Sequence, residues 1–249
     1  MNRPVHAARR RPRAWLVAAL APVAFLLGGC VYLRLLELKH QLADFDRNFT
    51  IQTTNGLRLT CLHPVLLSSD VRWLGLGPST VQKLGAAERW HLRWIKQLPP
   101  GVEEKGNFEI AFDLIFVDGK LTTFLLSESY FALMPKDFLI ASIKSLGGAK
   151  VNEKDRSVES RLAAPDRAAF TPPSRSDITG MLGVPTEEHR EGDRLMLRYR
   201  CVSDAPGLGD REFDIRLVFD AGTDRLLQTT GRIPIGTLNL DFTPATNSP

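Results

Sequence analysis

Residues that carry enzyme chemistry are scarce in this sequence. Its 249 residues include only 3 cysteines and 5 histidines, and none of them falls in a CxxC, HxH or HExxH spacing. Such short spacings are what a zinc site needs. A GxSxG serine motif, a Walker loop and a dinucleotide fingerprint are also missing. The sequence therefore predicts no metal site, no cofactor and no catalytic residues.

Long apolar runs and excess charge are missing from the body of the chain. The composition, 43% hydrophobic and 24% charged, is that of a globular protein and excludes a polytopic membrane protein. The net charge is +4, but five of the 32 basic residues lie in the first thirteen positions, without acidic neighbours. From Cys30 onward, 27 basic residues face 28 acidic ones, a net charge of −1. This balance predicts no nucleic-acid partner.

An export signal is predicted at the N-terminus. An arginine-rich start is followed by residues 14–27, fourteen positions without a charge, which is typical of a secretory signal peptide. This run ends in Leu27-Gly28-Gly29-Cys30, which resembles the lipobox of bacterial lipoproteins. The resemblance implies that residues 1–29 are removed and that the thiol of Cys30 carries a lipid anchor. Val31, rather than aspartate, follows Cys30, which implies an outer-membrane protein facing the periplasm.

An uncleaved signal anchor in the inner membrane is the alternative interpretation of the same segment. The uncharged run continues to residue 33, and its 20 residues are enough to span a bilayer. Pro22 and the Gly28-Gly29 pair favour cleavage over a continuous helix. In either case the protein meets the membrane through its N-terminus.

Residues 30–50 form the next predicted segment, an amphipathic helix or tether. Its apolar positions recur at helical spacing: Leu35, Leu38, Leu42 and Phe45. We expect this face to pack on the rest of the same chain.

Two cysteines remain after Cys30, and both lie in strand-like apolar runs. An oxidising compartment permits a disulfide between Cys61 and Cys201. Since 140 residues separate them and sequence shows no close approach, two unpaired, inert thiols are favoured.

The remaining sequence predicts an α+β fold of two tandem units. The first covers residues 51–151 and includes a helical insertion at 135–146. The second covers residues 174–243, after a linker at 152–173 and before a tail at 244–249. In each unit, Ser-Asp (Ser69-Asp70, Ser176-Asp177) caps a short helix that ends at Leu-Gly before proline. Three- to four-stranded antiparallel sheets follow.

Matching central strands are predicted at residues 108–116 and 213–219, and Asp118-Gly119 predicts a type I′ hairpin turn. Alternation with period two predicts these core positions: Trp94, Ile110, Phe112, Phe116, Leu197, Tyr199, Ile215, Leu217 and Phe219.

The second unit resembles a known family. Its helix, its Leu182-Gly183-Val184-Pro185 stop and its Phe213-Asp-Ile215 strand are similar to BamE/SmpA/OmlA-type outer-membrane lipoproteins. The β-lactamase-inhibitor-protein fold, a tandem of such units, is also similar. The resemblance covers residues 174–232 well and 68–127 more loosely. It implies a tandem envelope lipoprotein, and no partner-binding residue carries over.

These observations predict a non-catalytic, lipid-anchored envelope protein that acts as an interaction or assembly module for another envelope protein. A group of aromatic residues could anchor the partner, although core packing is the favoured interpretation of the strand tryptophans. The group comprises Trp73, Trp90, Trp94, Tyr130 and Phe131. The alternative function is a hydrolase or small-ligand-binding protein with its site between the two units.

Overall fold

The computed structural model describes most of the chain after residue 30. The described residues are 31–103, 108–132, 136–148, 150–152, 157–159, 171–208, 212–234 and 236–242. The predicted signal peptide, the predicted lipobox with Cys30, most of the predicted linker and the predicted tail lie outside the described residues.

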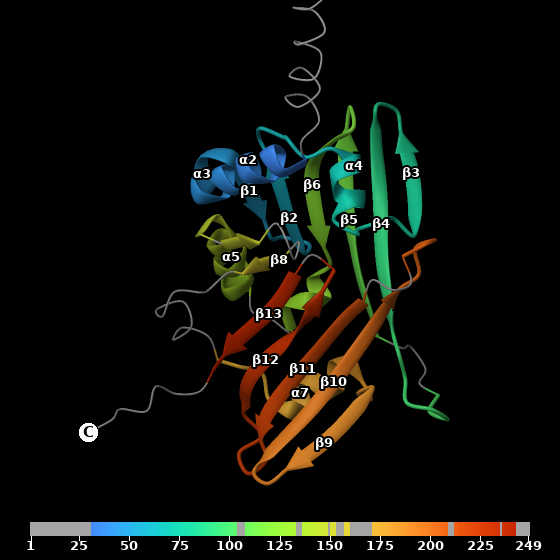
Figure 1. Cartoon of the computed structure of the whole chain (residues 1–249), viewed down its shortest axis with the longest axis vertical. Helices are drawn as coiled ribbons and strands as arrows, with labels where there is room; N and C mark the ends of the chain where they lie inside the picture. Colours follow the sequence, from blue (N-terminus) through green and yellow to red (C-terminus); the bar gives the residue numbers. More distant parts are fainter. Residues whose placement is uncertain are drawn as a thin grey trace, which may run out of the picture.

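The fold is α+β, and its dominant element is one 11-stranded antiparallel sheet (Figure 1). The strand order is β1-β2-β6-β5-β4-β10-β11-β12-β13, while β3 pairs with β4 and β9 pairs with β10. The strands are β1 (Phe49–Gln52), β2 (Leu57–Cys61), β3 (Thr80–Leu84), β4 (Ala87–Lys96), β5 (Glu109–Val117), β6 (Lys120–Leu126), β9 (Glu187–Glu191), β10 (Arg194–Ser203), β11 (Glu212–Asp220), β12 (Leu226–Ile233) and β13 (Gly236–Asp241). The predicted strands at 108–116 and 213–219 are therefore confirmed as β5 and β11.

The separate three- to four-stranded sheets that the sequence predicted are joined in the structure. The end of β4 pairs with the end of β10 through three residue pairs: Cys201 with Lys96, Val202 with Ile95, and Ser203 with Trp94. Local alternation predicts hairpins between neighbouring strands but holds no information on this long-range pairing. We call β1–β6 with α4 the first half, and α7 with β9–β13 the second half.

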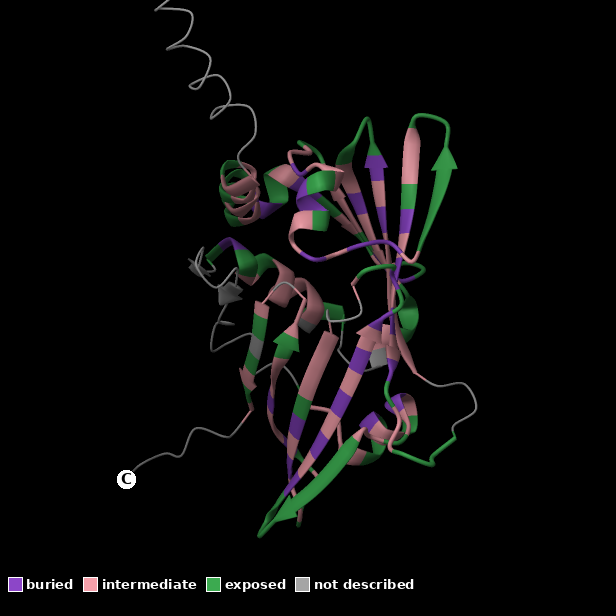
Figure 2. Cartoon of the chain, turned by 45° about the vertical axis from the view of Figure 1, so that its right-hand side comes forward, coloured by how far each residue is buried: buried purple, intermediate pink, exposed green. Residues whose placement is uncertain are grey.

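Two short helices cover one face of the sheet, α4 (Ser68–Trp73) in the first half and α7 (Arg175–Leu182) in the second. Buried and less buried positions alternate along the long strands (Figure 2). The buried positions of β4 and β10 share a face, because directly paired residues point to the same side and Lys96 and Cys201 are both buried.

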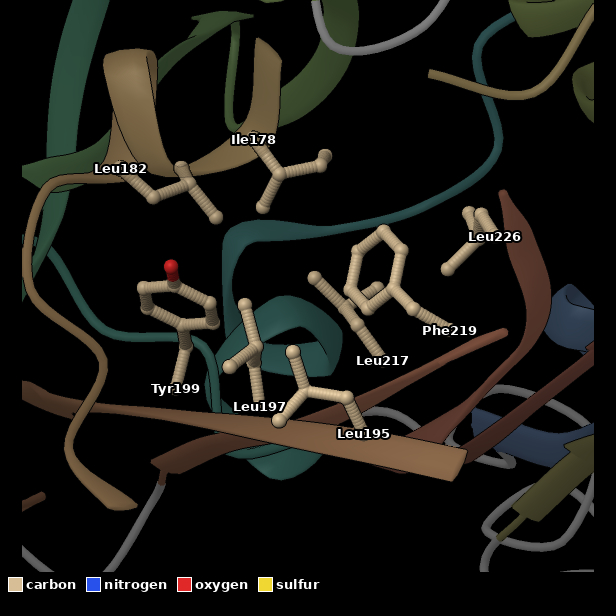
Figure 3. Close-up of a cluster of buried hydrophobic side chains, with 8 residues drawn as sticks. All are labelled: Ile178, Leu182, Leu195, Leu197, Tyr199, Leu217, Phe219 and Leu226. Atoms are coloured by element: carbon tan, nitrogen blue, oxygen red, sulfur yellow. The ribbon is translucent and has the colours of Figure 1, made fainter. Parts of the chain in front are cut away.

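The apolar core forms two clusters on this face. The α7 cluster consists of Ile178, Leu182, Leu195, Leu197, Tyr199, Leu217, Phe219 and Leu226 (Figure 3). The α4 cluster consists of Val71, Trp90, Leu92, Trp94, Leu114, Phe116 and Cys201. Of the nine predicted core positions, six are buried, and Ile110, Phe112 and Ile215 are partly buried against these clusters.

The helix caps differ from the prediction by a few residues. Asp70 and Asp177 do not themselves cap the helices but occupy the third helical position. From there each carboxylate accepts a hydrogen bond from the backbone N–H of the capping residue, Leu67 at 2.8 Å or Ser174 at 2.9 Å. The sequence predicted that the first helix ends at Leu76-Gly77 before Pro78. In the structure α4 already ends at Trp73, and Gly75, with φ 83°, follows it. Asp118 and Gly119, at φ 50° and 75°, form the predicted hairpin turn.

The N-terminal helix packs on its own chain, as expected. Here α2 (Val31–Ala43) is followed by α3 (Phe45–Asn48), and α2 contacts α5 (Lys136–Ser145) and the 3-10 turn η2 (Leu146–Gly148). A second 3-10 turn, η1 (Glu128–Ala132), follows β6. Part of the predicted linker instead pairs as two short strands, β7 (Lys150–Asn152) and β8 (Ser157–Glu159).

The two described cysteines are unpaired, which confirms the favoured interpretation. Burial raises the pKa of the Cys201 thiol to about 12 and raises that of half-buried Cys61. Both thiols therefore stay protonated and weakly reactive near neutral pH.

Candidate functional site

The candidate site is the face of the sheet opposite α4 and α7, which we call the open face. Its side chains come from the less buried positions of the four central strands. We define it by Arg89, His91, Arg93, Ile95, Glu109, Ala111, Asp113, Arg198, Arg200, Val202, Glu212, Asp214 and Arg216.

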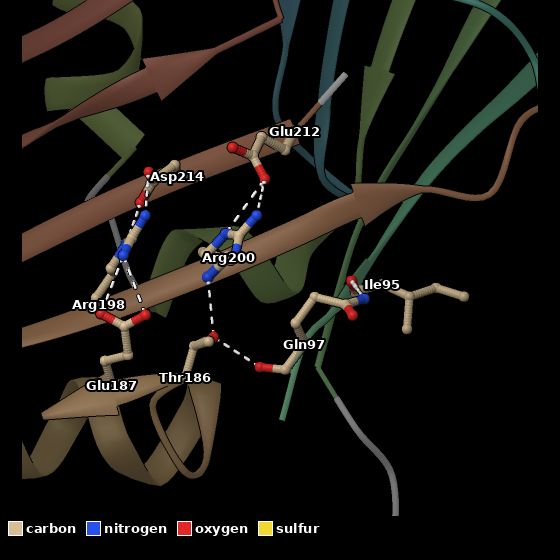
Figure 4. A network of polar contacts seen from close by, with 8 residues as sticks. All are labelled: Ile95, Gln97, Thr186, Glu187, Arg198, Arg200, Glu212 and Asp214. Atoms are coloured by element: carbon tan, nitrogen blue, oxygen red, sulfur yellow. Dashed lines mark hydrogen bonds and ion pairs between the residues drawn. The ribbon is translucent and has the colours of Figure 1, made fainter. Parts of the chain in front are cut away.

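Arginines on the second half pair with carboxylates of neighbouring strands (Figure 4). Arg198 donates to Asp214 at 2.7 and 2.8 Å and to Glu187 of β9 at 3.0 Å. The hydrogen bonds from Arg198 lower the pKa of Asp214 below its usual value, and the two carboxylates raise that of Arg198 further. Arg198 and Asp214 therefore both remain charged at physiological pH.

A second network connects the two halves of the sheet. Arg200 donates to Glu212 at 2.7 Å, and its backbone N–H donates to the Thr186 hydroxyl at 3.0 Å. The same hydroxyl donates to the Gln97 carbonyl oxygen at 2.6 Å (Figure 4). Thr186 therefore bridges β10 of the second half and the segment that follows β4 of the first.

The first half presents the same kind of pairing. Arg93 donates to Glu109 at 2.6 Å and lies 3.4 Å from Asp204, and the hydrogen bond to Glu109 is the main cause that raises the pKa of Arg93. Asp204 also accepts a hydrogen bond from the Ser79 hydroxyl.

Asp113 of the same half contacts two basic side chains, Arg89 and His91. Its carboxylate lies 2.5 Å from Arg89 and 2.8 Å from Nδ1 of His91. The His91 side chain is 40% exposed.

An apolar pair lies at the centre of these charges. Ile95 and Val202 are directly paired across the junction of β4 and β10, and both are partly buried. Apolar centres with arginine at their margins are common in protein–protein interfaces, where arginine is enriched and often contributes strongly to binding. The open face shares with such interfaces its arginines and its apolar centre, and differs from them in its four carboxylates and its lack of Trp, Tyr and Phe side chains.

No group of three or more His, Cys, Asp and Glu side chains in the described part of the chain could hold a metal ion. Packed side chains occupy the junction of the halves on the helix-covered face. The ring centroids of Trp94 and Phe213 lie 5.1 Å apart there, and the Lys96 ammonium donates a hydrogen bond to the Leu182 carbonyl oxygen. Two small hollows of about 290 and 310 Å³ lie elsewhere, beside α2 and α3.

The predicted aromatic group is divided between core and periphery. Trp90 and Trp94 are buried in the core, so the favoured interpretation of the strand tryptophans is confirmed. Trp73 packs edge-on against Tyr32 of α2. Tyr130, whose pKa burial raises to about 12, accepts a hydrogen bond from the Ala111 N–H at 2.6 Å. Phe131 is half-buried in η1.

The arginine pairs of the open face were not predicted from the sequence. A signal was present, because arginines recur with period two at Arg198 and Arg200 in β10 and at Arg89 and Arg93 in β4. Their carboxylate partners come from other strands, so only the register shows the pairs.

Among the described residues, no helix is both long and apolar enough to cross a bilayer. No protein-family model matches the chain, and no curated protein or solved structure is significantly similar to it.

Proposed function

We propose that this protein is a non-catalytic, lipid-anchored module of the bacterial envelope that binds another envelope protein through the open face. The observation that carries the proposal is the Ile95–Val202 pair, which lies between the arginine–carboxylate pairs of both halves. Basic and acidic groups alternate there, which suits a partner with both signs of charge and disfavours nonspecific binding to polyanions.

We further propose that the two halves are copies of one unit of the BamE/SmpA/OmlA type. Corresponding strands have equal lengths: five residues in β3 and β9, ten in β4 and β10, and nine in β5 and β11. The register of β5 shifts between Ile115 and Phe116, and that of β11 between Val218 and Phe219. This match places the two strands 103 residues apart, two fewer than the Phe108 and Phe213 alignment suggested.

Hydrogen bonds at the junction support the same relation. The N–H of Gln97 donates to the Arg200 carbonyl, and the N–H of Asp204 donates to the Arg93 carbonyl. The two donors, Gln97 and Asp204, are 107 residues apart, and so are the two acceptors, Arg93 and Arg200. Two copies of one unit related by a local two-fold axis at the Ile95–Val202 pair would make these two hydrogen bonds equivalent. The pairs Arg93–Glu109 and Arg200–Glu212 then become equivalent groups of the binding face.

The proposed localisation to the outer membrane depends on Cys30. Lipidation there would place the start of α2 directly at the membrane, on the periplasmic side of the outer membrane. A Cys30→Ala variant should lose labelling by a clickable fatty acid and accumulate as precursor. A purified protein whose intact mass still includes residues 1–29 would contradict the lipoprotein proposal and support an uncleaved anchor.

The proposed binding face is tested in cells that produce the protein. A photo-crosslinking amino acid at Val202 should give a discrete crosslinked product, and the same group at exposed Val184 is the matched control. Adding Arg93→Glu and Arg200→Glu should abolish the product at unchanged protein level, because both arginines then become acidic groups beside Glu109 and Glu212. Equal crosslinking at both positions would contradict the proposal.

A further inference from the structure

Exposed apolar side chains gather near one end of the molecule. Nine large apolar residues are exposed in the described part of the chain. Leu33 and Leu36 of α2 are 52% and 47% exposed, Leu84 at the end of β3 is 49% exposed, and Val117 at the end of β5 is 38% exposed. α2 and the turns β3–β4 and β5–β6 lie at the same end of the long axis, the upper end in Figure 1.

Hydrogen bonds connect the elements at this end of the molecule. The N–H of Asp118 in the β5–β6 turn donates to the Ala86 carbonyl in the β3–β4 turn. The N–H of Ser68, at the start of α4, donates to the Gly119 carbonyl at 3.0 Å. Asp70 of α4 then holds Arg34 of α2 through two hydrogen bonds of 2.6 Å. We call this end of the molecule the anchor end.

The chain that precedes α2 indicates what covers the anchor end. The uncharged run 14–27 and Cys30 come immediately before Val31, the first residue of α2. Leu33 and Leu36 follow Val31 by two and five residues, about 3 and 7.5 Å along a helix axis. A helix that starts at the membrane anchor keeps these two leucines within the depth of the interface, about 5–10 Å.

We propose that the anchor end rests on the bilayer surface, with Leu33 and Leu36 in the headgroup region and the turns β3–β4 and β5–β6 beside them. This inference rests on the proposed membrane anchor. Lys83 and Lys120 flank the two turns, but Glu88 and Asp118 offset their charge, so apolar contact rather than net charge holds this end on the lipid. The long axis then projects away from the membrane and carries the second half outward.

The test measures the depth of single positions in the lipid-anchored protein. In a Cys61→Ser background, a fluorophore is attached to a new cysteine at Leu36 or Leu84, or at the control positions Val102 or Val184, which are also exposed. The protein is reconstituted into vesicles of phosphatidylethanolamine and phosphatidylglycerol that contain nitroxide lipids. We expect severalfold stronger quenching at Leu36 and Leu84 than at the two controls.

Two double substitutions test whether the apolar side chains of α2 hold the anchor end on the lipid. Leu33→Asp with Leu36→Asp should reduce quenching of the fluorophore at Leu84, whereas Val102→Asp with Val184→Asp should not change it. All four positions are exposed, and circular dichroism shows whether each variant keeps its fold.

Flotation of the same vesicles distinguishes failure of the proposed membrane anchor from failure of the proposed contact between the anchor end and the bilayer. Protein that does not float with the vesicles contradicts the anchor and this inference together. Protein that floats but is quenched equally at all four positions overturns this inference alone and leaves the anchor intact.

Discussion

Two aspartates at the same position of two short helices show how much the surroundings of a residue matter. Asp70 of α4 and Asp177 of α7 each bind the N–H of a capping residue. Asp70 is fully buried and also binds Arg34, whose side chain is 21% exposed. The Asp177 carboxylate accepts hydrogen bonds from the N–H and the hydroxyl of Ser174, at the start of its own helix. The first aspartate therefore fixes α2 on the domain, and the second serves its own helix.

At the residue scale we predict unequal effects of the same substitution at these two positions. Asp70→Asn should destabilise the protein by about 2–3 kcal/mol, because it removes the charge of a fully buried carboxylate that binds Arg34 through two hydrogen bonds. Asp177→Asn should cost clearly less. Urea unfolding measures both, and Arg34→Met in the Asp70→Asn background should restore part of the loss. Equal effects at the two positions would show that the Arg34 pair adds no stability.

Elements could be predicted from the sequence where their signals are local. Hairpins follow from period two and from Asp118-Gly119, and the helix starts from Ser-Asp. The β4–β10 pairing has no local signal, and neither do the partners of Arg93 or Arg200, because each depends on strands far apart in the chain. Lys96 shows where prediction from local patterns fails. The period-two pattern of β4 places it on the buried face, whereas lysine as a residue type predicts exposure, and in the structure it is buried.

The docking of α2 depends on the close approach of two backbones. A Cβ on Gly147 of η2 would lie 2.5 Å from the backbone nitrogen of Ala43, whereas a Cβ on the adjacent Gly148 would contact no other atom within 4 Å. A side chain at residue 147 must therefore push α2 and η2 apart.

At the element scale we predict that Gly147→Ala destabilises the protein by about 1–3 kcal/mol through this overpacking. Gly148→Ala, the matched control, should leave stability unchanged or slightly raise it. Hydrogen exchange should become faster in α2 of the first variant only. Unchanged exchange there would mean that α2 is held by other contacts.

At the scale of the whole molecule, the two halves depend on a narrow connection. Three residue pairs join β4 to β10, and on the helix-covered face Lys96 reaches across to α7. Its side chain is 2% exposed, and its ammonium group lies at the negative end of the α7 dipole. Lys96 therefore adds to the other contacts across the junction, the Trp94–Phe213 ring contact and the Thr186 bridge, in holding the two halves together.

This arrangement makes the coupling between the halves measurable. The three described tryptophans, Trp73, Trp90 and Trp94, all lie in the first half, so their fluorescence reports that half, while far-ultraviolet circular dichroism reports both. The two signals should change together in urea in the native protein, as in a single cooperative unit.

Lys96→Ala removes the packing of the lysine's aliphatic chain and its hydrogen bond to the Leu182 carbonyl, and should lower the free energy of unfolding by about 2–4 kcal/mol. The two transitions should then separate. Lys96→Met keeps the volume of the stem without the ammonium group, so its curves should stay closer together than those of Lys96→Ala. If fluorescence and circular dichroism remain superimposed in Lys96→Ala, the strand pairing and the other junction contacts, such as Trp94–Phe213, are enough to couple the two halves without Lys96.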